Sequence, residues 1–187
     1  MTCFSSLFLR LTPLFIIWQF LLVSAELSDG VYLVSQKPPV QLGNTTYYLS
    51  LSGLSEKVQL QTLQEGSAAQ MWEITNTAKG VTLKNMAFDC YGYVGSLWQI
   101  LPIGAPLFCS NNNAPAPQIF QPRQNEDGTH LITHFNSSDP SLFWLMHTVP
   151  LDLTLGKQKV YGNITFVPLA TSFATSFWFE RVDDLRE

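Results

Sequence analysis

The stretch DGVYLVS at residues 29–35 begins a pattern that the sequence uses again at residues 79–85 (KGVTLKN) and at residues 127–133 (DGTHLIT). The three openings lie 50 and 48 residues apart. A repeat of this length indicates one supersecondary unit used three times, because such a unit cannot bury its apolar face alone. The predicted copies cover residues 29–78, 79–126 and 127–187.

Each copy closes on a polar, an apolar and an aromatic residue: Gln70-Met71-Trp72, Gln118-Ile119-Phe120 and Ser176-Phe177-Trp178. Apolar residues alternate at period two within the copies, and no segment keeps a helical period for three turns. The chain is therefore predicted to be all-β, with about twelve short strands, four in each copy. The strands expected before the closing ones are residues 31–35, 47–51 and 58–63, then 81–85, 88–94 and 105–110, then 130–134, 142–147 and 166–171.

The threefold period, the glycine openings and the Gln-x-Trp triplet at residues 70–72 resemble the β-trefoil, and specifically the ricin-B-type lectin pattern. Twelve strands in three units also favour a closed arrangement, because closure removes the exposed edges of an open sheet. The resemblance implies that Trp72, Phe120 and Trp178 meet in the core near a pseudo-threefold axis. In general pattern the chain is also similar to the fungal mycocypin and plant Kunitz-type trefoil inhibitors.

The first 25 residues have the pattern of a secretory signal peptide. Arg10 supplies a positive residue, residues 11–22 an apolar run, and residues 23–25 a small-residue cleavage site. The alternative is an uncleaved membrane anchor, since residues 4–25 could reach across a bilayer. Pro13 and the cleavage-like end favour removal. We therefore expect a secreted chain with a single domain at residues 26–187 and no membrane span after cleavage.

The composition argues against several classes of function. Without residues 1–25 the chain has 9 Lys and Arg against 14 Asp and Glu, a net charge of −5, so nucleic acid is not an expected partner. Charged residues make up 13% of the sequence, and no catalytic or phosphate-binding motif is present. His130 and His134 stand four apart in a predicted strand without a third ligand nearby. We expect no metal, no cofactor and no catalytic activity.

Secretion gives two cysteines and three asparagines a predicted role. Cys90 and Cys109 are an even pair in an oxidising compartment, which favours a disulfide over two buried thiols. Asn-x-Ser/Thr acceptors for N-glycosylation occur at Asn44, Asn136 and Asn163.

The resemblance to ricin-B-type lectins implies a candidate sugar site in the second copy. Such lectins use an Asp in the second strand of a copy, an aromatic after the third and an Asn near the closing Gln. Asp89 and Phe108 fit the first two roles, and Asn111, Asn112 and Asn113 lie near the third. The first and third copies lack the Asp. The other interpretation of Asp89 is a turn or strand-end aspartate.

Protease inhibition is the competing function that the trefoil resemblance implies, because trefoil inhibitors act through exposed loops. Long connections are expected around Trp98 in the second copy and around Lys157 and Lys159 in the third. The expected partner is therefore a glycan or cell-wall carbohydrate, or alternatively a protease or another extracellular protein bound by an effector-like module.

Overall fold

The computed structural model describes residues 27–36, 44–95, 105–110, 117–135, 143–155, 158–168 and 175–186. This part of the chain contains twelve β-strands, two short 3-10 helices and no α-helix, which confirms the all-β prediction. The elements are β1 (Gly30–Gln36), β2 (Tyr47–Ser50), β3 (Gln59–Thr62), η2 (Ala68–Gln70), β4 (Met71–Thr77), β5 (Gly80–Asn85), β6 (Cys90–Val94), β7 (Ala105–Ser110), β8 (Phe120–Gln124), β9 (His130–Phe135), β10 (Phe143–Leu155), β11 (Gln158–Pro168), β12 (Trp178–Arg181) and η4 (Asp183–Arg186).

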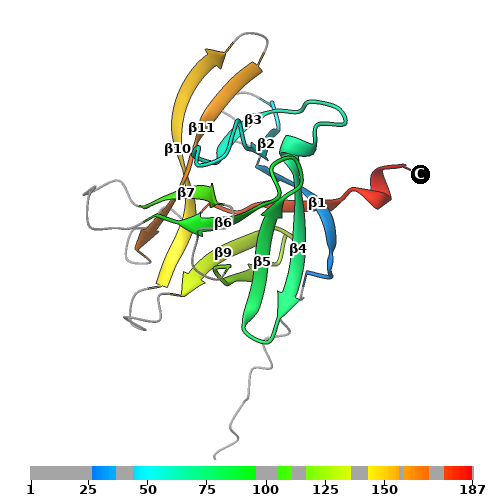
Figure 1. Ribbon diagram of the computed structural model, residues 1–187, viewed down its shortest axis with the longest axis vertical. Helices are drawn as coiled ribbons and strands as arrows, with labels where there is room; N and C mark the ends of the chain where they lie inside the picture. The colour runs from blue at the N-terminus through cyan, green and yellow to red at the C-terminus, as the bar shows by residue number, and fades with distance from the viewer. Residues whose placement is uncertain are drawn as a thin grey trace, which may run out of the picture.

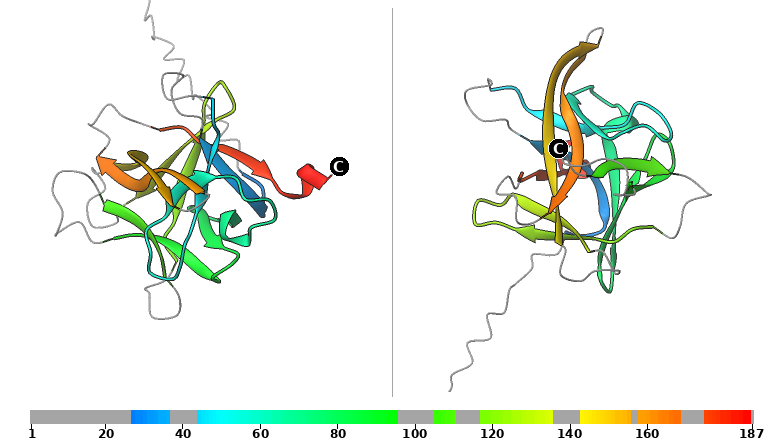
Figure 2. Two further views of the ribbon diagram at one scale, coloured as in Figure 1. Left: turned by 90° about the horizontal axis from the view of Figure 1, so that it is seen from above. Right: turned by 90° about the vertical axis from the view of Figure 1, so that its left-hand side faces the viewer.

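Six of the strands form a closed barrel. They pair antiparallel in the order β12–β1–β4–β5–β8–β9, and Figure 2 shows β12 in red beside β1 in blue. An isolated bridge between His130 of β9 and Phe177, directly before β12, completes the ring. The barrel therefore has no open edge.

The other six strands form three hairpins, β2–β3, β6–β7 and β10–β11. The hairpins contact one another through pairing of β11 with both β3 and β7, and through a bridge between Lys57 and Phe108. Each copy thus contributes two barrel strands and one hairpin. Figure 1 shows that the β10–β11 hairpin extends beyond the rest of the molecule.

The glycine in each opening has a steric role. Gly80 has a φ of +143°, and a Cβ at this position would collide with the carbonyl oxygen of Phe120. Gly128 has a φ of +82° in the turn before β9. This is the left-handed region that glycine enters without steric cost. The repeated glycine therefore marks a tight entry into the first strand of a copy.

The closing aromatic of the third copy differs from the prediction. Trp72 and Phe120 are fully buried, but Trp178 is 36% exposed and Phe177 is fully buried. The prediction that Trp178 is a core residue is therefore wrong, because the core aromatic of the third copy is the preceding residue, Phe177. Phe177 bridges to β9, as Trp72 pairs with β1 and Phe120 with β5. Successive side chains of a strand point to opposite faces, so an offset of one residue exchanges the core ring for an exposed one.

The polar residue two positions before each buried ring fixes the base of a hairpin. Gln70 accepts the amide hydrogen of a residue just after β3 at 2.7 Å. Gln118 accepts the amide hydrogen of Val94, the last residue of β6, at 2.6 Å. In the third copy Thr175 has this role, because its Oγ1 accepts the amide hydrogen of Thr148 at 3.4 Å. The closing triplet of the third copy is therefore residues 175–177.

The extra length of the third copy forms strand rather than the expected long connection. β10 continues to Leu155 and β11 begins at Gln158, so the inserted residues lengthen the hairpin. Residues 166–168 of the strand predicted at 166–171 belong to β11, and residues 169–171 lie outside the described residues. Pairing of β11 with both β3 and β7 fixes its position.

Candidate functional site

A disulfide joins the two strands of the β6–β7 hairpin. Cys90 and Cys109 are bonded with their Cα atoms 5.5 Å apart, as predicted, and both are fully buried. Burial alternates along both strands, so that Cys90, Gly92 and Val94 face the core while Tyr91 and Tyr93 point outward. The disulfide therefore holds the inner side of a hairpin whose outer side carries aromatic residues.

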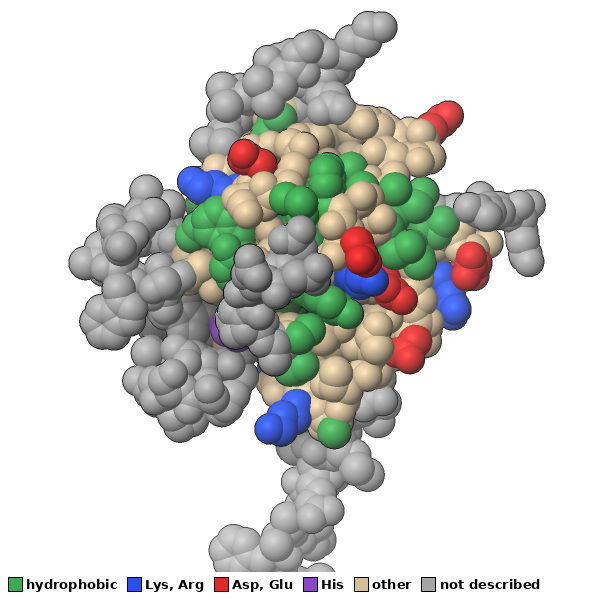
Figure 3. All heavy atoms as spheres, in the orientation of Figure 1, with side chains coloured by type: hydrophobic (Ala, Val, Ile, Leu, Met, Phe, Trp, Pro, Cys, Tyr) green, Lys and Arg blue, Asp and Glu red, His purple; other side chains and the backbone are tan. Residues whose placement is uncertain are grey.

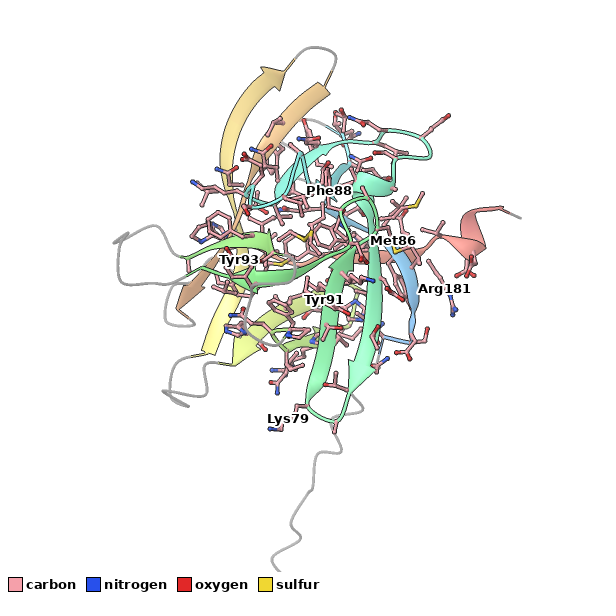
Figure 4. All side chains as sticks on the ribbon, viewed as in Figure 1. Lys79, Met86, Phe88, Tyr91, Tyr93 and Arg181 are labelled. Atoms are coloured by element: carbon pink, nitrogen blue, oxygen red, sulfur yellow. A yellow bond between two sulfur atoms is a disulfide. The ribbon has the colours of Figure 1, made fainter. Side chains whose placement is uncertain are left out.

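Aromatic rings gather on that outer side. Tyr93 pairs with Phe108 of β7, and their rings stack with centroids 5.6 Å apart. Tyr91 is 37% exposed. Figure 4 shows Tyr91 and Tyr93 along β6, and Figure 3 shows that hydrophobic side chains lie among charged ones on this face of the molecule.

A group of charges lies beside Tyr91. The Nζ of Lys84 is 2.5 Å from a carboxylate oxygen of Asp89 and 3.8 Å from one of Glu73. It also lies 5.8 Å from the centroid of the Tyr91 ring. The hydrogen bond with Asp89 is the main cause that raises the pKa of Lys84. The Asp89 side chain remains 85% exposed, so this carboxylate can also contact a ligand.

The backbone at Asp89 gives this residue a structural role as well. Its φ is +49°, in the left-handed region, at the turn before β6. Asp and Asn enter this region more readily than other residues with a Cβ. Both interpretations of Asp89 made from the sequence are thus compatible with its position.

The structure separates the two described residues of the predicted sugar site. Phe108 pairs with Tyr93, whereas Asp89 lies in the turn before β6, so the three residues from Cys90 to Tyr93 put about 10 Å of strand between them. The remaining predicted residues, Asn111, Asn112 and Asn113, lie outside the described residues. Asp89 and Phe108 therefore share the outer face of the hairpin but are not adjacent.

The site residues predicted from the sequence do not include Lys84, Tyr91 or Tyr93, which surround or extend the exposed part of this face. The alternation in the stretch CYGYV at residues 90–94 was the available signal, because a buried Cys90 places both tyrosines on the opposite side. Lys84 lies on β5 and pairs with Tyr91, a relationship that requires the strand register.

The predicted glycosylation sites differ in their surroundings. Asn44 is exposed. Asn163 is half-buried in β11, where its side-chain oxygen accepts a hydrogen bond from Gln59 at 3.1 Å. Asn136 lies outside the described residues. Glycosylation at these positions stays a prediction.

The candidate inhibitor residues lie mostly beyond the described part of the chain. Trp98 and Lys157 are outside it. Lys159 belongs to β11 and pairs with Thr154 of β10, so it stands in the extended hairpin rather than in a loop.

Within the described ranges, no group of three or more His, Cys, Asp or Glu could hold a metal ion. His130 and His134 both lie on β9, and burial lowers the pKa of each below the ordinary value of 6.5. None of the helices in the described part is long and apolar enough to cross a membrane.

Comparison with solved structures defines the fold. The chain is similar to ThreeFoil, a designed three-fold symmetric protein, with a TM-score of 0.60 and 11% identity over 82% of this chain and 100% of the designed one. It is also similar to a ricin B-like lectin of Macrolepiota procera in complex with lactose, with a TM-score of 0.54 and 14% identity over 83% of this chain and 99% of the lectin. The fold is a β-trefoil.

The chain is also similar to part of a larger solved structure. A mosquitocidal holotoxin matches with a TM-score of 0.55 and 13% identity, over 83% of this chain and 18% of the toxin chain. No protein-family model and no curated protein matches the sequence. At these identities the similarity defines the fold alone, and the function has to be argued from the side chains.

Proposed function

We propose that this β-trefoil is a secreted, non-catalytic carbohydrate-binding module, and that a sugar ring lies against Tyr91 on the outer face of the β6–β7 hairpin. The observation that carries the proposal is the exposed Tyr91 ring beside the Lys84–Asp89 ion pair. A sugar has an apolar side and an edge of hydroxyl groups, so it suits an aromatic face next to charged hydrogen-bonding groups. The fold shared with a ricin B-like lectin in complex with lactose supports this assignment.

The side chains around Tyr91 would contact different groups of the sugar. The exposed Asp89 carboxylate accepts hydrogen bonds from sugar hydroxyls, and the Lys84 ammonium donates to a hydroxyl or ring oxygen. The stacked rings of Tyr93 and Phe108 continue the surface along the hairpin for a further sugar unit.

The second copy differs from the other two at this place. The residue equivalent to Tyr91 is Tyr48 in the first copy, where it pairs with Ser35, and Leu145 in the third, where it pairs with Thr133. Lysine therefore stands beside the aromatic residue in the second copy alone. We propose one site of this kind in the molecule.

A glycan array tests the function and an Asp89→Asn variant tests the site. Asn keeps the left-handed backbone accessible and removes the negative charge. We expect the unaltered chain to bind a defined set of glycans on the array, and we expect the Asp89→Asn variant to lose most of that binding signal. Asp183→Asn, which removes another exposed carboxylate, is the control and should bind normally. If the unaltered chain bound no glycan, the proposed function would be contradicted. If the Asp89→Asn variant bound glycans as well as the unaltered chain, the proposed site would be contradicted.

Protease inhibition is the second candidate, and the extended β10–β11 hairpin favours it. This hairpin extends from the molecule with strands of 13 and 11 residues, and Lys159 lies on one of them, so the hairpin could present this residue to a partner (Figure 1). An effector-like module could bind a protein through the same hairpin. Titration against papain-like and trypsin-like proteases tests the inhibitor proposal. The absence of inhibition at micromolar concentrations of the chain would contradict it.

A further inference from the structure

A second pair of aromatic residues, one exposed and one half-buried, lies across β12, β1 and β2, away from the β6–β7 hairpin. Ser35 of β1 pairs with Trp178 on one side and with Tyr48 on the other. Directly paired residues of antiparallel strands lie on the same face of a sheet. Ser35 is fully buried, Tyr48 is half-buried and Trp178 is 36% exposed. The two aromatic residues thus stand on the strands on either side of a small buried serine.

A carboxylate belongs to the same face. Glu180 follows Trp178 by two residues on β12, which places it on the same side of the strand at about 7 Å. The Ser35 hydroxyl donates a hydrogen bond to Oε1 of Glu180 at 3.2 Å. This contact holds the carboxylate over β1, the strand between the two aromatic residues.

No cation of the described residues neutralises Glu180. Its neighbour Arg181 is directed elsewhere, with Nη1 at 3.4 Å from the Ser28 hydroxyl and Nε at 3.7 Å from Asp183. Burial, and secondarily the negative charge of Glu180, raises the pKa of the Tyr48 hydroxyl. The face therefore combines two aromatic residues with a carboxylate that no cation of the described ranges neutralises.

The second copy shows what occupies the equivalent place there. Ser35 pairs with Trp178 and Tyr48, and Lys84 pairs with Glu73 and Tyr91. In this register Ser35 is equivalent to Lys84, Trp178 to Glu73, and Tyr48 to Tyr91. In the second copy the Lys84 ammonium lies over Tyr91 and against two carboxylates. In the first copy Ser35 replaces this lysine, while the aromatic ring of Tyr48 and the carboxylate of Glu180 lie beside the serine.

We propose that Trp178, Glu180 and Tyr48 form a binding site for the ammonium group of a small organic cation, which takes the position that the Lys84 ammonium has in the second copy. Aromatic faces attract cations, most strongly at tryptophan, and the adjacent carboxylate adds Coulombic attraction. Ser35 acts as a positioning residue for Glu180. The site joins the first and third copies and does not depend on sugar binding at the β6–β7 hairpin.

Titration of the full chain with choline, followed by calorimetry and by the tryptophan indole NMR signals, tests the proposal. The neutral analogue 3,3-dimethylbutan-1-ol has the same shape without the charge and should bind about tenfold more weakly or not at all. Nα-acetyl-lysine amide, titrated in parallel, distinguishes a primary ammonium of a peptide from a methylated one. Binding of either cation supports the proposal, and binding of neither overturns it.

Two variants locate the site. Glu180→Gln keeps the acceptor for Ser35 and removes the charge, so the affinity for choline should fall about tenfold while the fold is retained. Trp178→Leu, at a half-exposed position, should lower it similarly. Glu65→Gln, which removes an exposed carboxylate elsewhere, is the matched control and should bind choline unchanged. Equal affinity of choline and its neutral analogue, or unchanged affinity of Glu180→Gln, would overturn the proposal.

Discussion

The backbone amide of Val94 donates a hydrogen bond to Oε1 of Gln118 at 2.6 Å, across the base of the β6–β7 hairpin. Gln118 is the first residue of the closing triplet of the second copy, and Phe120, the third residue of that triplet, is fully buried. One triplet therefore fixes the hairpin that carries the proposed sugar site and fills the core beneath it.

Loss of this hydrogen bond should destabilise the fold. Gln118→Ala leaves the Val94 amide without its partner, which we expect to lower the free energy of unfolding by about 1–3 kcal/mol. Urea denaturation gives the value. Gln121→Ala, at an exposed position of β8, is the control and should change it by about 0.5 kcal/mol or less. Equal effects of the two substitutions would contradict the role of Gln118.

The two tryptophans at the ends of copies should respond differently to truncation. Trp72 is fully buried and its indole donates to the carbonyl of Leu49 at 3.1 Å, so Trp72→Ala should cost about 3–5 kcal/mol of unfolding free energy. Trp178→Ala removes a ring that is 36% exposed and should cost well under half of that. If Trp178→Ala proved the more damaging in urea denaturation, the assignment of Phe177 to the core would be wrong.

The disulfide should contribute measurably to stability. Replacing both Cys90 and Cys109 with serine removes a crosslink with a sequence separation of 19 residues, and the free energy of unfolding should fall by about 3 kcal/mol. Intact-mass measurement with and without reductant, under denaturing conditions, checks the bond directly. An unchanged mass on reduction would show that the cysteines are free.

Stability should fall as the pH drops below about 6.5. Burial lowers the pKa of His130 and His134 in the folded chain, and the His130 residue is 5% exposed. The unfolded chain then binds more protons below the ordinary pKa of 6.5, so unfolding is favoured as the pH falls from there towards the folded pKa values. Urea midpoints measured across this range should decline. Replacing both histidines with glutamine should flatten that decline, and an unaltered pH dependence would argue against their role.

Strand positions could be predicted from the sequence because alternation and repeated glycines are local signals. Every predicted strand of the first two copies overlaps an observed one, as for β7 at Ala105–Ser110. The third copy was less predictable. Its closing triplet, residues 175–177, has Thr175 in place of glutamine, and a tryptophan directly after Phe177 gave the wrong register.

The candidate site was only partly predictable for a similar reason. Asp89 could be selected from a family pattern, whereas Lys84 and Tyr91 come together through the pairing of β5 with β6. The same holds for Ser35, Trp178 and Tyr48, which are brought together by the closure of the barrel. Contacts between distant segments depend on register, and a single sequence does not define it.

The central claim is that a sugar ring lies against Tyr91, and calorimetric affinity for the glycan that binds most strongly on the array tests it most directly. Tyr48 has the equivalent position in the first copy, which makes Tyr48→Ala the matched control for Tyr91→Ala. We predict that Tyr91→Ala weakens glycan binding about tenfold or more while Tyr48→Ala leaves it unchanged. Unchanged binding by Tyr91→Ala, in a chain that unfolds at the normal urea concentration, would contradict the account.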